Sequence, residues 1–352
     1  MADWALDKEE MREALFAQAP RKAAGPDEIT FEVLRRIWTA QEDLLFRLYA
    51  GALRVGWHPR PFREAILVAL RKAGKRDPAL PRSYRLIALL PTLGKTLEKV
   101  VAVRLARLGL EKGWIASEQS GSVAGRSATD AALTLIHDIE AAWTYAPPRV
   151  VSALMIDVKG AYDAVHAIRL LRLLHQLGVP LQLLRWLLAF LSERKAVMRL
   201  DNEEDALQAV DTGIPQGSPV SPVLYIFFAA PLHRLFGPSA EDEDLRSVRA
   251  LSFVDDKALY ACSTSVDENI RLLGKAYRRA LRWASEQGLT LSTSPHRDTA
   301  CSAHLYHFRT ARSRLLASRA PSSGLVSSST HDSASMPTSR HAPRRVIRRR
   351  RP

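Results

Sequence analysis

The residues best suited to chemistry in this chain are two adjacent carboxylates, Asp255 and Asp256, between two short apolar segments. The segments 251–254 and 258–261 are typical of strands, so a hairpin is predicted with the acidic pair and Lys257 at its tip. Because neighbouring carboxylates repel each other, a turn that aims both at one place favours a divalent cation there. Oxygen ligands of this kind suit Mg2+ or Mn2+. An acidic pair is also common in solvated turns that bind no metal. Other parts of the chain must therefore support the metal-site interpretation.

A third carboxylate, Asp157, lies near the end of the apolar run 150–158. A run of this kind predicts a strand that is buried on both faces. A carboxylate in such a strand is costly unless it is paired or coordinates a cation, which makes Asp157 a candidate for the same site. Tyr162 follows five residues later, and Asp163 is predicted to cap the helix that comes next.

Cations are concentrated in the turn after a strand-like segment at 65–70, where residues 71–76 include Arg71, Lys72, Lys75 and Arg76. Two interpretations stand: a solvated turn, or a phosphate clamp in which Lys supplies point charges and Arg a bidentate fork. The segment 93–108 predicts a helix with Lys95, Lys99 and Arg104 between its apolar positions. Its cations are either solvated or face a nucleic-acid backbone.

Two loops have the composition of ligand-contacting loops. Residues 213–222 contain three prolines and two glycines, which restrict the backbone path, and Gln216 lies between them with an amide that can contact a base or a ribose. Residues 119–127 are small and flexible, and Arg126 lies just before a predicted helix start, where it can reach a phosphate.

Hydrophobic periodicity predicts the elements that must position these residues. Helices are expected at 3–18 with Asp7 as the cap, from 26 onward, and at 41–55, 128–143, 180–193, 223–232 and 265–287. A polar hairpin is expected at 196–211. The Ser-, Pro- and Arg-rich composition after residue 293 predicts little order there.

The composition restricts the class of protein. A chain of 352 residues that is 47% hydrophobic has room for about two domains. Its net charge of +14 indicates a polyanionic partner, although +9 of that charge lies in residues 311–352, which hold ten Arg and one Asp. Two cysteines, Cys262 and Cys301, provide no disulfide framework. The longest apolar run, 223–232, is too short to span a bilayer, so no membrane association is expected.

Taken in order, these pieces resemble the reverse-transcriptase domain of non-LTR (LINE-type) retrotransposons. The resemblance covers roughly residues 10–290 and is carried by Ala-Gly-Pro-Asp at 24–27, Tyr-Arg-Leu-Ile at 84–87, Gly-Arg-Ser at 125–127, Asp-Val-Lys-Gly-Ala-Tyr-Asp at 157–163, the loop at 213–222 and Phe-Val-Asp-Asp at 253–256. It implies an α+β right-hand polymerase: an N-terminal extension and fingers at 1–149, a ferredoxin-like palm at 150–292 and a disordered tail at 293–352. A thumb is expected to be missing or degenerate.

The resemblance also implies roles for individual residues. Asp157 and Asp255 would hold two Mg2+ ions, with Mn2+ as the alternative, aided by the Val158 backbone and with Asp256 beside them. Substrates would be an RNA template, a DNA primer and dNTPs. The dNTP would be bound by Lys72 or Lys75, Arg85, Gln216 and, under its sugar, Tyr162, while Arg126 and Lys95 would contact nucleic acid. A nuclear or cytoplasmic ribonucleoprotein location is expected.

Some positions depart from the family pattern. Ala24 and Leu86 replace prolines, Ser120 replaces an aromatic residue, and no Lys follows Lys275, where the family has a lysine that assists pyrophosphate departure. We interpret this as a C-terminally truncated or frame-shifted copy. Two alternatives remain beside an active reverse transcriptase: a catalytically inert relic that only binds nucleic acid, and a group II intron maturase with the same motifs.

Overall fold

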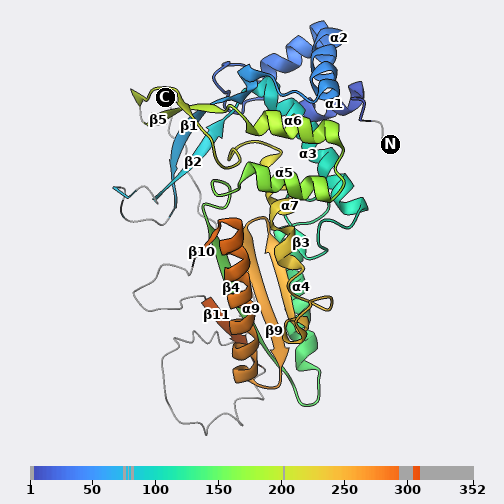
Figure 1. Ribbon diagram of the computed structural model, residues 1–352, viewed down its shortest axis with the longest axis vertical. Helices are drawn as coiled ribbons and strands as arrows, with labels where there is room; N and C mark the ends of the chain where they lie inside the picture. Colours follow the sequence, from blue (N-terminus) through green and yellow to red (C-terminus); the bar gives the residue numbers. More distant parts are fainter. Residues whose placement is uncertain are drawn as a thin grey trace, which may run out of the picture.

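A computed structural model describes residues 4–73, 77, 79–80, 83–200, 203–292 and 304–309. The molecule is elongated and mixes helices with two separate sheets, one toward each end of its long axis (Figure 1). The mixed α and β composition agrees with the fold class expected from the sequence.

The first sheet combines distant parts of the chain. It runs in the order β2-β1-β5-β6, with β7 also paired to β5, and its strands are β1 (Glu64–Arg71), β2 (Tyr84–Leu89), β5 (Lys195–Leu200), β6 (Glu203–Glu204) and β7 (Gln208–Ala209). β1 pairs antiparallel with β2 and parallel with β5. The predicted polar hairpin at 196–211 therefore exists, and it completes a sheet that begins 130 residues earlier in the chain. The strands of the two sheets alternate along the sequence, so the sheets do not test the domain boundaries predicted at 149 and 292. Those boundaries stay predictions.

The second sheet carries the predicted acidic hairpin. Its order is β10-β4-β9-β8-β3, with β11 also paired to β4, and its strands are β3 (Gln119–Ser120), β4 (Val150–Lys159), β8 (Val248–Phe253), β9 (Asp256–Ser263), β10 (Thr290–Ser292) and β11 (His304–Phe308). β11 is an ordered strand within the region for which the sequence predicted little order. Backbone pairing with β4 over five residues orders this segment, which contains Leu305, Tyr306 and Phe308. The rest of the predicted tail, and any thumb there, lies outside the described residues.

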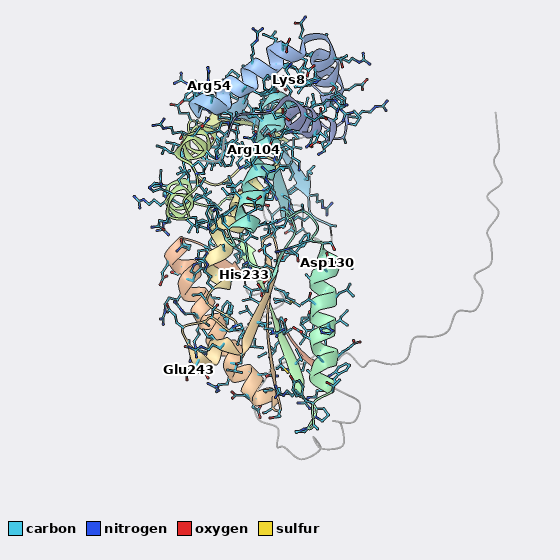
Figure 2. The ribbon with its side chains drawn as sticks, turned by 90° about the vertical axis from the view of Figure 1, so that its right-hand side faces the viewer. Lys8, Arg54, Arg104, Asp130, His233 and Glu243 are labelled. Carbon is cyan, nitrogen blue, oxygen red and sulfur yellow. The ribbon has the colours of Figure 1, made fainter. Side chains whose placement is uncertain are left out.

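Two helices enclose the second sheet, α9 (Val266–Gln287) on one face and α4 (Ala128–Trp143) on the other (Figure 2). Val151 and Ala153 of β4 pack toward α4, whereas Leu154 and Ile156 belong to the core that includes α9. β4 is buried on both faces only as far as Leu154; beyond it, alternate residues are exposed. The prediction of full burial is thus wrong for the end of the strand, where a cavity separates β4 from α4.

The remaining helices lie at the other end of the molecule or at its junction with the second sheet, except for one short helix beside β8 and α9. They are α1 (Lys8–Phe16), α2 (Phe31–Val55), a 3-10 turn η1 (Arg60–Arg63), α3 (Thr92–Glu111), α5 (Ala167–Gln176), α6 (Leu181–Leu191), α7 (Ser221–His233) and α8 (Glu243–Arg246). The two helices predicted at 26–55 are both present, the first beginning at Phe31, and α2 joins them across a kink at Gln41, where φ is −142°. Asp7 precedes α1 as predicted, but its side chain makes no capping hydrogen bond.

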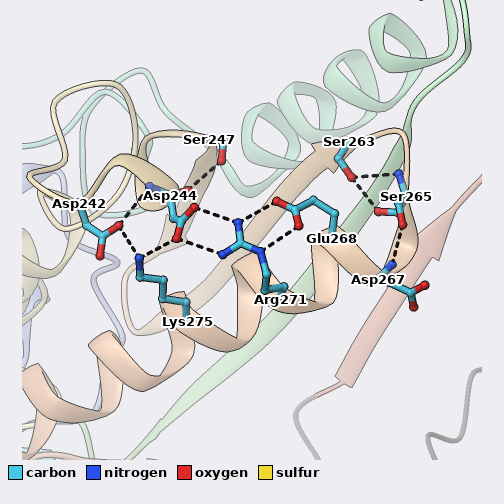
Figure 3. Close-up of polar contacts among 9 residues, drawn as sticks. All are labelled: Asp242, Asp244, Ser247, Ser263, Ser265, Asp267, Glu268, Arg271 and Lys275. Atoms are coloured by element: carbon cyan, nitrogen blue, oxygen red, sulfur yellow. Dashed lines mark hydrogen bonds and ion pairs between the residues drawn. The ribbon is translucent and has the colours of Figure 1, made fainter.

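An ionic network joins α9 to the segment before β8 (Figure 3). Arg271 bonds both Asp244 and Glu268, and Lys275 bonds Asp242 and Asp244. These side chains are substantially exposed, so the network contributes orientation more than free energy. Among the described residues, no helix combines the length and apolarity needed to cross a bilayer.

Candidate active site

The acidic hairpin forms as predicted, with a shift of its turn. Phe253 pairs with Asp256, so Val254 and Asp255 alone form the turn and Asp256 begins β9. Val254 has a φ of 56°, the left-handed conformation that a tight two-residue hairpin demands. Lys257, expected at the tip, is a buried strand residue. The short turn separates the two carboxylates, with Asp255 on the turn and Asp256 on the strand.

Asp157 lies beside this hairpin. β4 and β9 pair up to Ile156 and Lys257, and one further residue along this register places Asp157 opposite Asp256. Burial and the negative charges of Asp255 and Asp157 raise the pKa of Asp256, and the cation of Arg85 opposes the shift. The three carboxylates therefore share one negative field, and the residues that the sequence singled out for it lie together.

Lys257 supports the hairpin from behind. Its Nζ lies 2.9 Å from the Ser252 hydroxyl and 3.4 Å from Nε2 of His233, at the end of α7. Burial lowers the pKa of Lys257 to about 8, and the Asp255 carboxylate opposes this shift. The cluster connects both strands of the hairpin to α7, so it gives the turn a fixed base.

Tyr162 packs face to face on Tyr225 of α7, with ring centroids 5.6 Å apart and an interplanar angle of 9°. Burial, followed by the negative charge of Asp255, raises the pKa of Tyr162 to about 12. Tyr162 and Gln216 line one cavity of about 340 Å3, together with Lys22 and Lys99. The structure therefore brings together two predicted nucleotide contacts with Lys99, one of the helix cations noted in the sequence, and with Lys22.

The loop at 213–222 is tightly seated. The Gln216 carbonyl accepts a 2.7 Å hydrogen bond from the Ala88 backbone N–H of β2. A Cβ on Gly217, whose φ is +134°, would lie only 2.3 Å from the Ala88 carbonyl oxygen. Ile214 N–H donates to the Tyr162 carbonyl at 2.9 Å. This loop consequently connects the first sheet to the strand end that carries the carboxylates.

The basic hairpin of the first sheet faces the same region. Burial raises the pKa of Asp256, and the positive charge of Arg85 opposes that shift. Burial also raises the pKa of Asp163, and the positive charges of Arg194 and Lys72 oppose it. Lys75 lies outside the described residues. Asp163 does not cap a helix as predicted, because α5 begins only at Ala167 and the residue before it is His166.

Two predicted nucleic-acid contacts have other partners. Lys95 is 8% exposed and lies in the fields of Glu98 and Asp27, with its pKa lowered mainly by burial. The first turns of α3 are largely buried, and the nucleic-acid contact of Lys95 stays a prediction. Arg126 donates to the carbonyls of Ala116 and Gln119, so it stabilises its own loop.

Sequence reasoning missed a buried polar group on α3. Glu98 is fully buried, and its carboxylate accepts a hydrogen bond from Ser218 of the 213–222 loop. The one available signal was the dense apolar composition around it, with Val100, Val101 and Leu105 nearby. That composition indicates a helix without a free face, where a Glu needs a partner.

The donor set at the carboxylates fits a magnesium ion chemically. Asp157, Asp255 and Asp256 offer hard oxygen ligands in one negative field, which a divalent cation would relieve. The described part of the chain contains no group of three or more His, Cys, Asp or Glu side chains arranged to hold a metal. Mg2+ is usually bound by one or two carboxylates together with substrate phosphates, so the carboxylates alone need not form such a group.

An acidic strand end beside a two-residue acidic hairpin, covered by a basic hairpin and a glutamine loop, is the arrangement expected of a template-directed polymerase. Residues 70–296 match the family model described as reverse transcriptase (RNA-dependent DNA polymerase). The match spans more than half of the chain, and the protein belongs to this family. The resemblance noted from the sequence motifs is confirmed.

Several curated relatives are similar to the chain. It is 28% identical over 276 residues to the probable RNA-directed DNA polymerase from transposon BS of Drosophila melanogaster, covering 78% of the chain and 30% of the relative. It is 26% identical over 287 residues to the RNA-directed DNA polymerase from mobile element jockey of Drosophila funebris, covering 81% and 30%. The retrovirus-related Pol polyprotein from type-1 retrotransposable element R1 of Bradysia coprophila is 28% identical over 225 residues, covering 62% and 21%. The chain thus spans less than a third of each of these relatives.

Proposed function

We propose that this chain is the RNA-directed DNA polymerase domain of a non-LTR retrotransposon, which transfers nucleotides from dNTPs to the 3′-hydroxyl of a primer annealed to RNA. One observation carries the proposal: the register places Asp157 opposite Asp256, beside Asp255 in the turn, and the three share a negative field. In this proposal the first sheet supplies the fingers and the second sheet the palm of a right-hand polymerase.

Asp157, Asp255 and the Val158 backbone would hold magnesium, with Asp256 beside them. When bound, two such ions lower the pKa of the attacking hydroxyl and neutralise the triphosphate. The chain's own residues hold the carboxylates in place. The Lys257 cluster fixes the hairpin, and β4 fixes Asp157 through its pairing with β9.

The nucleotide would lie between the two sheets. Lys72 and Arg85 carry positive charge at the end of the β1–β2 hairpin, which suits the triphosphate. Tyr162 and Gln216 border one cavity, which suits the sugar and the nascent base pair. An aromatic ring at Tyr162 leaves little space for a 2′-hydroxyl, so deoxynucleotides are the proposed substrates.

An apolar cavity of about 460 Å3 lies between α4 and the second sheet, directly beside Asp157 and Asp256. Met155 and Phe253 are 39% and 40% exposed at its edge. These side chains suit the sugar and base faces of a primer end, whose hydroxyl must approach the carboxylates. The basic charge of the chain suits the phosphates of the duplex.

The test is Mg2+-dependent incorporation of dNTPs on a primed RNA template. We expect extension by the wild-type chain and a loss on the order of 1,000-fold or more in Asp255→Ala, Asp256→Ala, because the preorganised charge of the site is removed. The matched control is Asp242→Ala, an exposed carboxylate of the α8–α9 network. A folded wild-type chain that binds RNA without extending the primer would refute the polymerase proposal and favour an inert nucleic-acid-binding protein.

A further inference from the structure

A carboxylate outside the acidic hairpin is buried beneath the 213–222 loop. Glu98 of α3 has no exposed surface, and Ser218 Oγ donates a hydrogen bond to its Oε2. Its other oxygen, Oε1, has no hydrogen-bond partner among the described residues. An ionisable group retained in this setting is costly to stability, so a purely structural explanation is weak.

The Glu98–Ser218 contact is one of several connections that fix the path of the loop. The Ser218 hydroxyl also accepts a hydrogen bond from Val220 N–H at 3.2 Å, which closes the turn after Gln216. Ala88 N–H holds the Gln216 carbonyl from β2. Arg194 donates to the Gly213 carbonyl at 2.8 Å, where the loop begins. Gln216 therefore lies between anchored points on both sides.

The charge of Glu98 acts on more than one of these connections. Burial lowers the pKa of Arg194 to about 10, and the negative charges of Glu98 and Asp163 oppose that shift. Lys95, one turn before Glu98 on α3, is affected in the same way by Glu98 and Asp27. An ionised Glu98 thus accepts from Ser218 and also stabilises the cation that holds Gly213.

The imidazole of His58 lies near Glu98 Oε1 but carries no positive charge to balance the carboxylate. Its Nε2 lies 3.9 Å from Glu98 Oε1, and neither ring nitrogen has a hydrogen-bond partner among the described residues. The ring is packed edge-on against Phe62, Trp186 and Phe190. Burial, with the nearby charge of Arg63, lowers the pKa of His58 to about 3, so the imidazole is neutral near pH 7. Glu98, whose pKa burial raises to about 7, is the member of this cluster that changes charge there.

We propose that Glu98 is a positioning residue: its ionised carboxylate holds Gln216 against the incoming nucleotide by securing Ser218 and Arg194. The inference rests on the proposed polymerase function, because Gln216 needs a nucleotide to contact. Glu98 itself touches neither substrate nor metal. Its effect should therefore fall on the use of dNTPs rather than on binding of the primer and template.

The test compares wild type with Glu98→Gln, which retains the side-chain shape and removes the charge. kcat and KM for dNTP are measured from pH 6 to pH 9 on a primed RNA template. We expect KM in Glu98→Gln to exceed the wild-type value by roughly tenfold at pH 8, the loss of one charged hydrogen bond. At pH 6 the two KM values should nearly coincide, since wild-type Glu98 is then largely protonated and, like the amide of the variant, uncharged. Primer–template affinity should be unchanged.

Two further variants make the result specific. Glu111→Gln removes a carboxylate from the same helix that is exposed and pairs only with Arg107 among the described residues, so its KM should match wild type at every pH. Ser218→Ala removes the loop's contact while keeping Glu98, and it should raise KM in the same direction. If Glu98→Gln does not fold, Ser218→Ala is the test variant. A KM for dNTP in Ser218→Ala equal to the wild-type value then overturns the inference.

The possible failures are distinguishable. A wild-type chain that extends the primer, with a ratio of wild-type to Glu98→Gln KM that is constant across pH, overturns the positioning role alone. A wild-type chain without polymerase activity overturns the proposed function, and the positioning role with it. A pH-dependent ratio for Glu98→Gln together with a flat ratio for Glu111→Gln supports both.

Discussion

Glu98 ionises inside the protein, where its charge opposes folding. Burial raises its pKa from 4.5 to about 7, so the folded state binds this proton more tightly than the unfolded state. The resulting stabilisation is complete below pH ~4.5 and is lost as the pH rises through about 7, by about 3 kcal/mol at most. Denaturant unfolding between pH 4 and 8.5 should show this loss in wild type and its absence in Glu98→Gln. Parallel stability curves for the two proteins would contradict the burial argument.

Tyr162 should control the choice of sugar. Replacement by Val shortens the side chain beside Gln216 and removes the ring that would meet a 2′-hydroxyl. We expect Tyr162→Val to improve ribonucleotide use relative to deoxynucleotide use by roughly 10- to 100-fold, an effect worth about 1–3 kcal/mol. Single-nucleotide incorporation with paired dNTP and NTP measures the ratio.

Tyr225→Phe is the matched control for Tyr162. The ring stacks on Tyr162, and its buried hydroxyl has no hydrogen-bond partner among the described residues. Removing that hydroxyl leaves the stack in place, so the sugar preference should stay at its wild-type value. A shift in Tyr225→Phe as large as that in Tyr162→Val would assign the effect to general loosening of the site.

At the scale of elements, the 213–222 loop depends on its contact with β2. Gly217→Ala would place a methyl carbon against the Ala88 carbonyl and would break the hydrogen bond between Ala88 and Gln216. We expect a loss of extension on the order of 100-fold, since small displacements of a substrate-contacting group are costly. Gly178→Ala has a similar positive φ of +87° without any neighbour within 4 Å, and it should retain activity. Equal losses in the two variants would show that backbone strain alone is responsible.

β11 should contribute to the stability of the second sheet. Phe308 packs against the cluster that includes Val151 and Tyr260, beneath α4. We expect Phe308→Ala to lower the free energy of unfolding by about 1–3 kcal/mol, less than for a fully buried aromatic residue. Arg309→Ala, the exposed neighbour, should leave it nearly unchanged. A Phe308→Ala protein as stable as wild type would contradict the packing of β11 on β4.

At the scale of the whole molecule, the charge of +14 should make binding to RNA strongly dependent on salt. Each phosphate neutralised on a single strand contributes a slope of about −0.7 to log K against log salt concentration. Because residues 311–352 carry +9 of the charge, a chain ending at residue 310 should show a shallower slope with primer extension retained. Filter binding from 50 to 400 mM salt measures it. An unchanged slope would place the phosphate contacts entirely outside this segment.

The sequence alone determined the family, the three carboxylates and most helices and strands, because these depend on local properties. Hydrophobic periodicity reports which face of a segment is buried, and the Asp-Asp pair between short strands reports a hairpin. The sequence did not predict that Val254 and Asp255 alone form the turn, since the register of a hairpin depends on its turn type and on how β8 and β9 pair.

Tertiary structure alone decided what the charged residues contact. The apolar neighbours of Lys95 and Glu98 indicate a largely covered helix, but only the fold shows what the two charges contact. β11 is a short segment in a Ser- and Arg-rich part of the sequence, yet the free edge of β4 orders it. In each case the deciding interaction joins residues far apart in the chain, and local propensity carries no information about such a partner. The chemistry could therefore be named from the sequence, whereas the residues that hold it in position emerged only from the folded chain.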